Sequence, residues 1–167
     1  MDERVFTNIR NVHKLFTDQG LTLALAESCT GGLISHYLTM LPGSSAFFQA
    51  GLVTYSNASK MSILGLASGT IETYGVISDA AAREMADKAR SLLKADYALA
   101  TTGNLGPEVL EGKERGLVYI AVSAREKTIS EEHRLTGDRM SNKEQAALLA
   151  LKLLLETAKG KGHGPAT

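Results

Sequence analysis

Hydroxyl, thiol and carboxylate side chains are concentrated in one short stretch, Glu27-Ser28-Cys29-Thr30-Gly31-Gly32, which follows an apolar run. The oxygen and sulfur atoms of these side chains can act as nucleophiles or as hydrogen-bond acceptors. The two glycines allow a ligand to approach the backbone closely. The stretch is therefore the first candidate for a functional site.

Ser28 is a candidate nucleophile if a nearby base accepts its proton, and histidine is the usual base. The four histidines are poorly placed for this role, because they fall within predicted helices, on a hairpin arm or in the C-terminal tail. Lys60 is a better candidate base, since it falls in the first turn of a predicted helix, where the helix dipole disfavours the charged ammonium. The alternative to a Ser28–Lys60 dyad is a helix-capping serine and a solvated lysine.

Other residues of the same stretch have two readings each. Glu27 either orients the site or satisfies a loop N–H group, and Cys29 is either a nucleophile or a small buried side chain. Gly31 and Gly32 could present N–H groups to a phosphate, although the stretch lacks the spacing of a P-loop.

Two further segments carry ligand-binding potential. The turn over residues 101–107 is either an oxyanion-binding or ligand-binding turn or a plain strand ending. Arg139, before the final helix, either contacts a phosphate or lies on the surface. No cluster of His, Cys and acidic residues with metal-ligand spacing is visible, so we expect no metal and no cofactor.

Strands and helices alternate along the predicted chain. Helices are predicted over 3–19, 33–41, 57–66, 78–94 and from about 141 onward; strands are predicted over 21–26, 46–56, 96–103 and 116–123, with an exposed antiparallel arm over 123–135. Asn57, Ser78 and the Ser141/Glu144 pair are the predicted helix caps. The pattern predicts an α/β fold, a three-layer α/β/α sandwich with a mixed, mostly parallel sheet.

The three polar loops after the strands that end near residues 26, 56 and 103 should cluster, because ligands bind where the carboxyl ends of strands meet. The chain of 167 residues is expected to form one domain over 1–158 and a flexible tail over 159–167.

The composition excludes several classes of partner and location. The 18 basic and 18 acidic residues cancel, so no general basic field favours nucleic acid or an anionic membrane. The single cysteine excludes an intramolecular disulfide. No segment resembles a signal peptide or approaches the roughly 20 apolar residues of a membrane span, and we expect a cytoplasmic protein.

Four blocks occur in a characteristic order: A-E-S-C-T-G-G, P-G-S-S-x-x-F, V-T-Y-S-N-x-x-K and Y-G-V-I-S. Over residues 5–157 the sequence resembles the C-terminal domain of the competence/damage-inducible CinA family, the nicotinamide mononucleotide deamidases. The resemblance implies hydrolysis of nicotinamide mononucleotide to nicotinate mononucleotide and ammonia, without a metal, by a stand-alone domain that forms a homodimer.

The same resemblance implies roles for individual residues. Ser28 is the implied nucleophile, Lys60 the implied base, and Tyr55 assists positioning or proton transfer. Backbone N–H groups near Ser28 and in the 102–107 turn would stabilise the oxyanion. The implied substrate-binding residues are Glu27, Thr30, Gly31, Gly32, Ser44, Thr102, Gly103, Asn104, Gly106 and Arg139.

The sequence departs from the family pattern in one loop. The family's G-I-A-G-P-x-G-G and the following K-P-V-G appear here as Gly103–Leu110 and Lys113–Gly116, and the double glycine is replaced. Glu108 adds a carboxylate that would repel a phosphate unless it points away. Two alternatives follow: an amidohydrolase acting on a different amide, or a catalytically silent small-molecule-binding or interaction protein.

Overall fold

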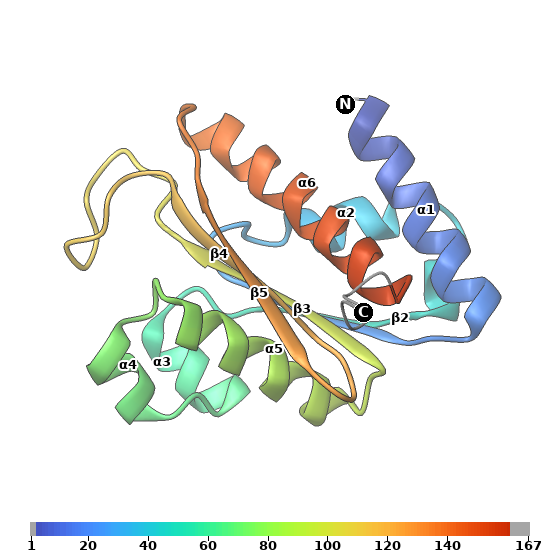
Figure 1. Cartoon of the computed structure of the whole chain (residues 1–167), viewed down its shortest axis with the longest axis horizontal. Helices are drawn as coiled ribbons and strands as arrows, with labels where there is room; N and C mark the ends of the chain where they lie inside the picture. The colour runs from blue at the N-terminus through green and yellow to red at the C-terminus, as the bar shows by residue number, and fades with distance from the viewer. Residues whose placement is uncertain (1–2, 161–167) are drawn as a thin grey trace, which may run out of the picture.

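A computed structural model describes residues 3–160 as one sheet covered by helices on both faces (Figure 1). The α/β fold class and the mixed sheet are thereby confirmed. Most of the tail predicted over 159–167 lies outside the described residues. Within residues 3–160, no helix combines the length and apolar character that a membrane span requires.

The sheet has the strand order β2-β1-β3-β4-β5. Its strands are β1 (Leu23–Glu27), β2 (Phe48–Val53), β3 (Tyr97–Gly103), β4 (Leu117–Ser123) and β5 (Thr128–Arg134). β1 pairs in parallel with both β2 and β3, whereas the β3–β4 and β4–β5 pairs are antiparallel. The pairings are thus divided equally between the two kinds, and β4 and β5 form the predicted hairpin arm.

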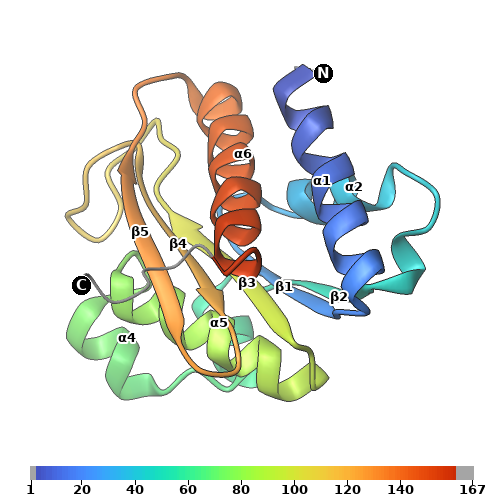
Figure 2. The same cartoon turned by 45° about the vertical axis from the view of Figure 1, so that its right-hand side comes forward.

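The helices lie in two layers, one on each face of the sheet (Figures 1 and 2). One layer holds α1 (Glu3–Gln19), α2 (Leu33–Thr39) and α6 (Arg139–Ala158); the other holds α3 (Asn57–Ser59), α4 (Ser68–Tyr74) and α5 (Asp79–Leu93). Two single turns, η1 (Ser44–Ala46) and η2 (Lys60–Leu64), complete the described elements. Three layers are therefore present, as the sequence predicts.

Each layer packs through a face that its periodicity predicts. In α1 the residues Val5, Ile9, Val12 and Phe16 are buried at helical spacing against the sheet and α6. The α5 layer is built from alanines on the helix and on β1, β3 and β4, which lets the helix approach the sheet closely. The central strand β1 is completely buried.

Two predicted helix caps differ from the structure. Ser56, and not Asn57, is the N-cap of α3, and it forms a capping box with Ser59. Asp138 caps α6 through the Ser141 N–H, three residues before the predicted start at Ser141. Ser78 caps α5 as predicted. In both corrected cases a side chain just before the predicted cap reaches the free N–H groups first.

Candidate functional site

The loops that follow β1, β2 and β3 meet at one edge of the sheet, as the sequence predicts. The Ser28 N–H donates to the Thr101 carbonyl at 3.0 Å, and the Thr54 N–H donates to the Glu27 carbonyl at 2.9 Å. These main-chain bonds extend the parallel pairing of the three strands by one step. They bring the residues after each strand into a common polar region.

Ser28 and Lys60 are in direct contact at this edge. The Lys60 Nζ donates to Ser28 Oγ at 3.0 Å and to the Thr54 carbonyl at 2.8 Å. Only 1% of Lys60 is exposed, and Ser28 is also buried. Lys60 begins η2, a π-helical turn that follows the single turn of α3, and such turns recur at functional sites. The amine is thus held against the hydroxyl by a second, main-chain partner.

Burial is the main cause that lowers the pKa of Lys60 below its ordinary value of 10.5. The helix dipole expected from the sequence is a poor explanation, because α3 has only three residues. Negative charge on Cys29 or Glu111 would raise the same pKa. Burial also raises the pKa of the Cys29 thiol to about 12, so this thiol carries no charge near neutral pH and Glu111 is the opposing charge.

A cavity of about 270 Å³ opens over the Ser28–Lys60 pair. Six of the predicted site residues line it: Ser28, Tyr55, Lys60, Thr102, Gly103 and Arg139. Seven residues complete the lining: Cys29, Asn57, Val76, Ile77, Leu105, Leu110 and Glu111. The cavity therefore combines a hydroxyl, an amine, a guanidinium, a carboxylate and several apolar side chains.

Tyr55 and Arg139 form a pair on this cavity. Arg139 donates to the Tyr55 hydroxyl at 2.8 Å and to the Gly106 carbonyl at 2.5 Å. Tyr55 is 59% exposed, so this residue lies on the solvent-exposed side of the cavity, whereas Lys60 is buried. A guanidinium in this place suits an anionic group of a ligand whose other end reaches Ser28.

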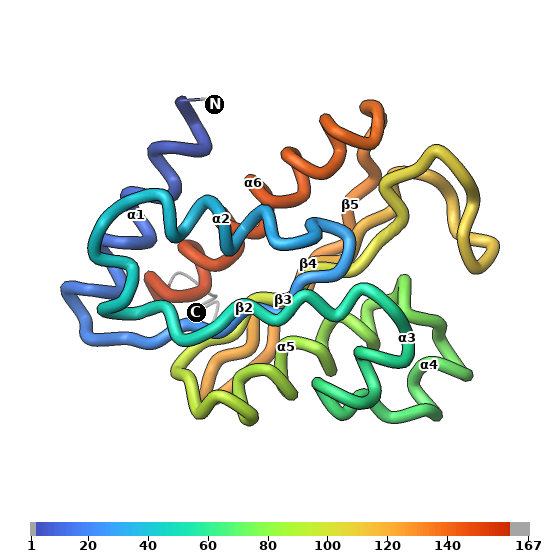
Figure 3. The backbone as a smooth tube through the Cα atoms, turned by 180° about the vertical axis from the view of Figure 1, so that it is seen from behind, coloured from blue at the N-terminus to red at the C-terminus, as the bar shows by residue number. Residues whose placement is uncertain are grey.

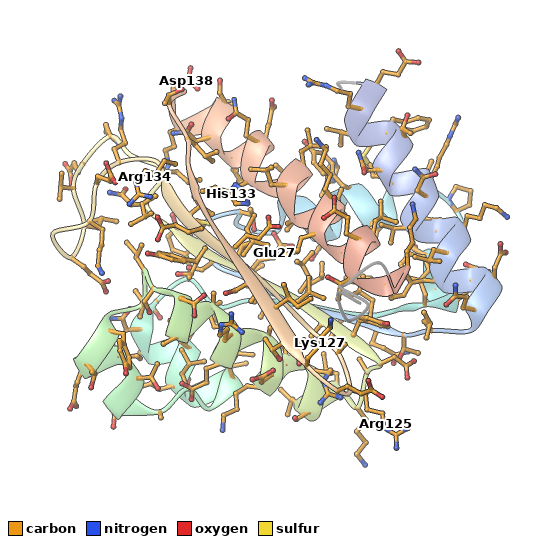
Figure 4. All side chains as sticks on the ribbon, viewed as in Figure 1. Glu27, Arg125, Lys127, His133, Arg134 and Asp138 are labelled. Carbon is orange, nitrogen blue, oxygen red and sulfur yellow. The ribbon has the colours of Figure 1, made fainter. Side chains whose placement is uncertain are left out.

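Glu27 and Thr30 are placed near Ser28 but do not line the cavity. The Glu27 carboxylate is completely buried (Figure 4) and accepts bonds from the N–H groups of Gly32, Ile34 and Ser35 at the start of α2. It also accepts bonds from the hydroxyls of Thr30 and Ser35. These side chains hold the turn that presents Ser28. Glu27 thus has the second of its two expected roles, in which it accepts hydrogen bonds from loop N–H groups.

Gly31, Gly32 and Ser44 are likewise outside the cavity. Gly32 has a φ of 92° and is the N-cap residue before α2, so it serves the geometry of the turn. Ser44 lies at the end of the sheet where β1 and β2 begin, because it precedes β2, whose first residue Phe48 pairs with Leu23. Ser28 lies at the other end, where these strands finish. Its closeness to Ser28 in sequence is therefore not closeness in space.

Asn104 and Gly106 build the 104–116 loop instead of lining the cavity. The Asn104 side chain donates to the carbonyls of Glu108 and Lys113 and accepts from the Gly106 N–H. The Asn104 N–H donates to Leu117 O. The N–H groups of Asn104, Gly106 and Ser28 therefore already have protein acceptors, and these three expected oxyanion donors are occupied.

Sequence reasoning missed several cavity residues, of which Asn57 and Glu111 are polar. Asn57 lies three residues before Lys60, and this helical spacing was a usable signal. Glu111 had no such signal, since it lies in the loop that departs from the family pattern. The carboxylate expected beside the site belongs to Glu111, whereas Glu108 does not line the cavity.

Cys29 should behave as an inert buried thiol. Only 6% of it is exposed, and its pKa of about 12 leaves very little thiolate at pH 8. We expect iodoacetamide to alkylate the folded protein at least about a hundredfold more slowly than the urea-unfolded chain. Intact-mass spectrometry at timed intervals measures this, and equal rates in the two states would contradict it.

Within the described part of the chain, no group of three His, Cys, Asp or Glu side chains is arranged to hold a metal ion. The chemistry that the cavity can support with its own residues is that of a serine hydroxyl beside a buried amine whose pKa is lowered, as in acyl transfer.

Comparisons with known proteins agree with this architecture. The CinA-like protein of Shewanella sediminis is 43% identical over 136 residues, which cover 81% of this chain and 32% of that protein. The chain spans about a third of the length of the curated relatives it matches.

Solved structures extend the similarity to the fold. The crystal structure of the competence/damage inducible protein CihA from Agrobacterium tumefaciens has a TM-score of 0.90 and 34% identity, covering 95% of this chain and 98% of that one. The competence or damage-inducible protein from Enterobacter asburiae also has a TM-score of 0.90, with 33% identity, covering 94% of this chain and 99% of that one. The CinA C-terminal domain family matches residues 7–158, and the chain belongs to this family.

Proposed function

We propose that the protein hydrolyses the carboxamide of nicotinamide mononucleotide, giving nicotinate mononucleotide and ammonia. The observation that carries this proposal is the 3.0 Å contact between Ser28 Oγ and the buried Lys60 amine on the wall of a cavity. A neutral amine within hydrogen-bond reach is what a serine needs to become a nucleophile. The family resemblance supplies the substrate.

The proposed reaction has two halves. Neutral Lys60 accepts the Ser28 proton while Ser28 Oγ bonds to the amide carbon. The carbon–nitrogen bond then breaks, and the proton held by Lys60 passes to the departing ammonia. Water next attacks the nicotinoyl ester, Lys60 takes one of its protons, and that proton returns to Ser28 as the acid is released.

Two further side chains have proposed roles in substrate binding. Arg139, held by Tyr55 and the Gly106 carbonyl, binds the phosphate at the open side of the cavity. The Asn57 side-chain amide is the candidate contact for the carboxamide oxygen, because it lines the cavity one helical turn from Lys60. Val76, Ile77 and Leu105 supply an apolar wall for the ring.

The direct test is the release of ammonia and nicotinate mononucleotide by the purified protein, with the Ser28→Ala variant beside it. We expect turnover in the parent protein and a loss of at least about a thousandfold in the variant. Circular dichroism shows whether both are folded. A folded parent protein that leaves the nucleotide intact, or a variant that keeps normal turnover, would contradict the proposal.

A further inference from the structure

The segment that departs from the family pattern forms a strap across one side of the cavity. This strap, residues 104–116, connects β3 to β4 and projects at the same end of the sheet as α3 and α4 (Figure 3). On one side it is tied to α6, where Arg139 donates to the Gly106 carbonyl and Asn142 donates to the Leu105 carbonyl. On the other side Glu111 ties it to the segment before α5.

Glu111 uses both carboxylate oxygens for this second attachment. Oε1 accepts from the Val76 N–H at 3.1 Å, and Oε2 accepts from the Ile77 N–H at 3.2 Å. Thr102 fixes the same segment by donating to the Val76 carbonyl at 2.6 Å. Glu111, Val76, Ile77 and Thr102 all line the cavity, so the attachment is part of its wall.

The observed position of the Glu111 carboxylate requires that residue 75 has no side chain, as in Gly75. A Cβ added at Gly75 would lie 2.4 Å from Glu111 Oε2, and Gly75 has a φ of 76° that favours glycine. Gly75 and the N–H groups of Val76 and Ile77 therefore surround the Glu111 carboxylate. Because each oxygen accepts a single N–H bond from the 76–77 segment, it retains capacity for a ligand.

Three ionisable side chains that line the cavity, Arg139, Lys60 and Glu111, differ in the charge that they bring to it. Arg139 is a permanent cation that is held at the open side by Tyr55. Lys60 must be neutral to act as a base. Glu111 is the carboxylate of the lining, and in a cavity of about 270 Å³ its negative charge acts on any ligand group close to the Ser28–Lys60 pair.

We propose that Glu111 is a specificity-determining residue that selects amides carried on a positively charged ring. This inference rests on the proposed function, and it identifies the positive charge of the ring as the feature of the substrate that Glu111 recognises. A pyridinium ring spreads its positive charge next to the carboxamide, and Glu111 stabilises it. Hydrolysis turns the neutral carboxamide into a carboxylate, which Glu111 repels, so the same residue favours release of the product.

Binding to the Ser28→Ala protein tests this inference without requiring turnover. The probes are N1-methylnicotinamide, a pyridinium cation, and 3-methylbenzamide, its neutral isostere. Dissociation constants come from NMR titrations. We expect the cation to bind about tenfold more tightly than the isostere, equivalent to about 1.4 kcal/mol. The preference should decrease as sodium chloride is raised, because salt screens the charge of an exposed residue.

Two additional variants separate charge from structure. Adding Glu111→Gln to Ser28→Ala should remove most of the preference for the cation while changing binding of the isostere by less than about twofold. Glu108→Gln is the matched control, since it removes a carboxylate of the same strap that does not line the cavity, and it should keep the preference.

Three results would overturn the inference: equal binding of the two probes, no binding of the cation, or an equal loss of both probes in Glu111→Gln. The last result would reduce Glu111 to a structural attachment of the strap. Failure of the proposed function has a different signature, because the release of ammonia from nicotinamide mononucleotide is measured with Ser28 in place. A protein that prefers the cation but releases no ammonia would keep the inference about Glu111 and reject the deamidase.

Discussion

Replacing Lys60 by methionine should lower the rate of amide hydrolysis by at least about a thousandfold while the protein stays folded. Methionine fills a similar volume in this buried place but cannot accept the Ser28 proton. The substitution also leaves the Thr54 carbonyl without its lysine donor, which costs about 1 to 3 kcal/mol of stability. Turnover of nicotinamide mononucleotide and a urea-unfolding curve measure the two effects.

Lys60→Arg is the control that separates the base from the positive charge. Arginine keeps a long cationic side chain but does not lose its proton, so this variant should be as inactive as Lys60→Met. The double variant Ser28→Ala/Lys60→Met should be no worse than either single variant, because the two residues act as one unit. Normal turnover in folded Lys60→Arg would exclude Lys60 as the base.

The same role fixes the direction of the pH dependence. Burial lowers the pKa of Lys60, so its neutral form exists at a lower pH than that of an ordinary lysine. The value of kcat/KM should rise with pH as Lys60 loses its proton, and it should reach a plateau once Lys60 is neutral. The pKa that describes this rise should lie below 10.5. Because Glu111 raises this pKa, Glu111→Gln should move the limb to lower pH.

Replacing Glu27 by alanine should destabilise the whole domain by about 4 kcal/mol or more, a large share of the 5 to 15 kcal/mol that holds a typical domain together. The change removes the acceptor of three N–H groups at the start of α2 and of the hydroxyls of Thr30 and Ser35. These groups are buried or half-buried and would lose their shared partner. The urea midpoint and the melting temperature measure the loss.

Glu126→Ala provides the matched control for this prediction. Glu126 is exposed between β4 and β5, and its removal should change the free energy of unfolding by no more than about 0.5 kcal/mol. Glu27→Gln should fall between the two, because an amide keeps one acceptor oxygen but points N–H groups at existing donors. If Glu27→Ala unfolded at the same urea midpoint as the parent protein, the turn would not need the carboxylate.

Local patterns in the sequence indicated most of the elements, although not α4, and they pointed to Ser28 and Lys60 as a candidate pair. Apolar residues at helical spacing predicted α1 and α2, cap residues marked α5 and α6, and short apolar runs between turns predicted β1, β3 and β4. These signals are local because the period of each element is read from neighbouring residues. Ser28 and Lys60 were recognisable since each follows a predicted strand and carries a reactive group.

The details of the site depended on contacts that sequence spacing does not encode. Ser44 is near Ser28 in sequence, but the parallel pairing of β1 and β2 separates them to opposite edges of the sheet. The sequence left two roles open for Glu27, orienting the site or satisfying a loop N–H group, and the fold of the start of α2 around its carboxylate supports the second role. Glu108 and Glu111 lie in one loop, and only its path decides which of them reaches the cavity.

The sequence by itself therefore determined the α/β class, the loops that meet at the cavity, and Ser28 and Lys60 as the candidate hydroxyl and amine. Tertiary structure alone decided that Lys60 is buried against Ser28, that Glu27 supports α2 and that Glu111 enters the cavity wall. The physical reason is that burial and hydrogen-bond partners depend on which segments pack together, whereas periodicity and residue type are properties of each segment alone.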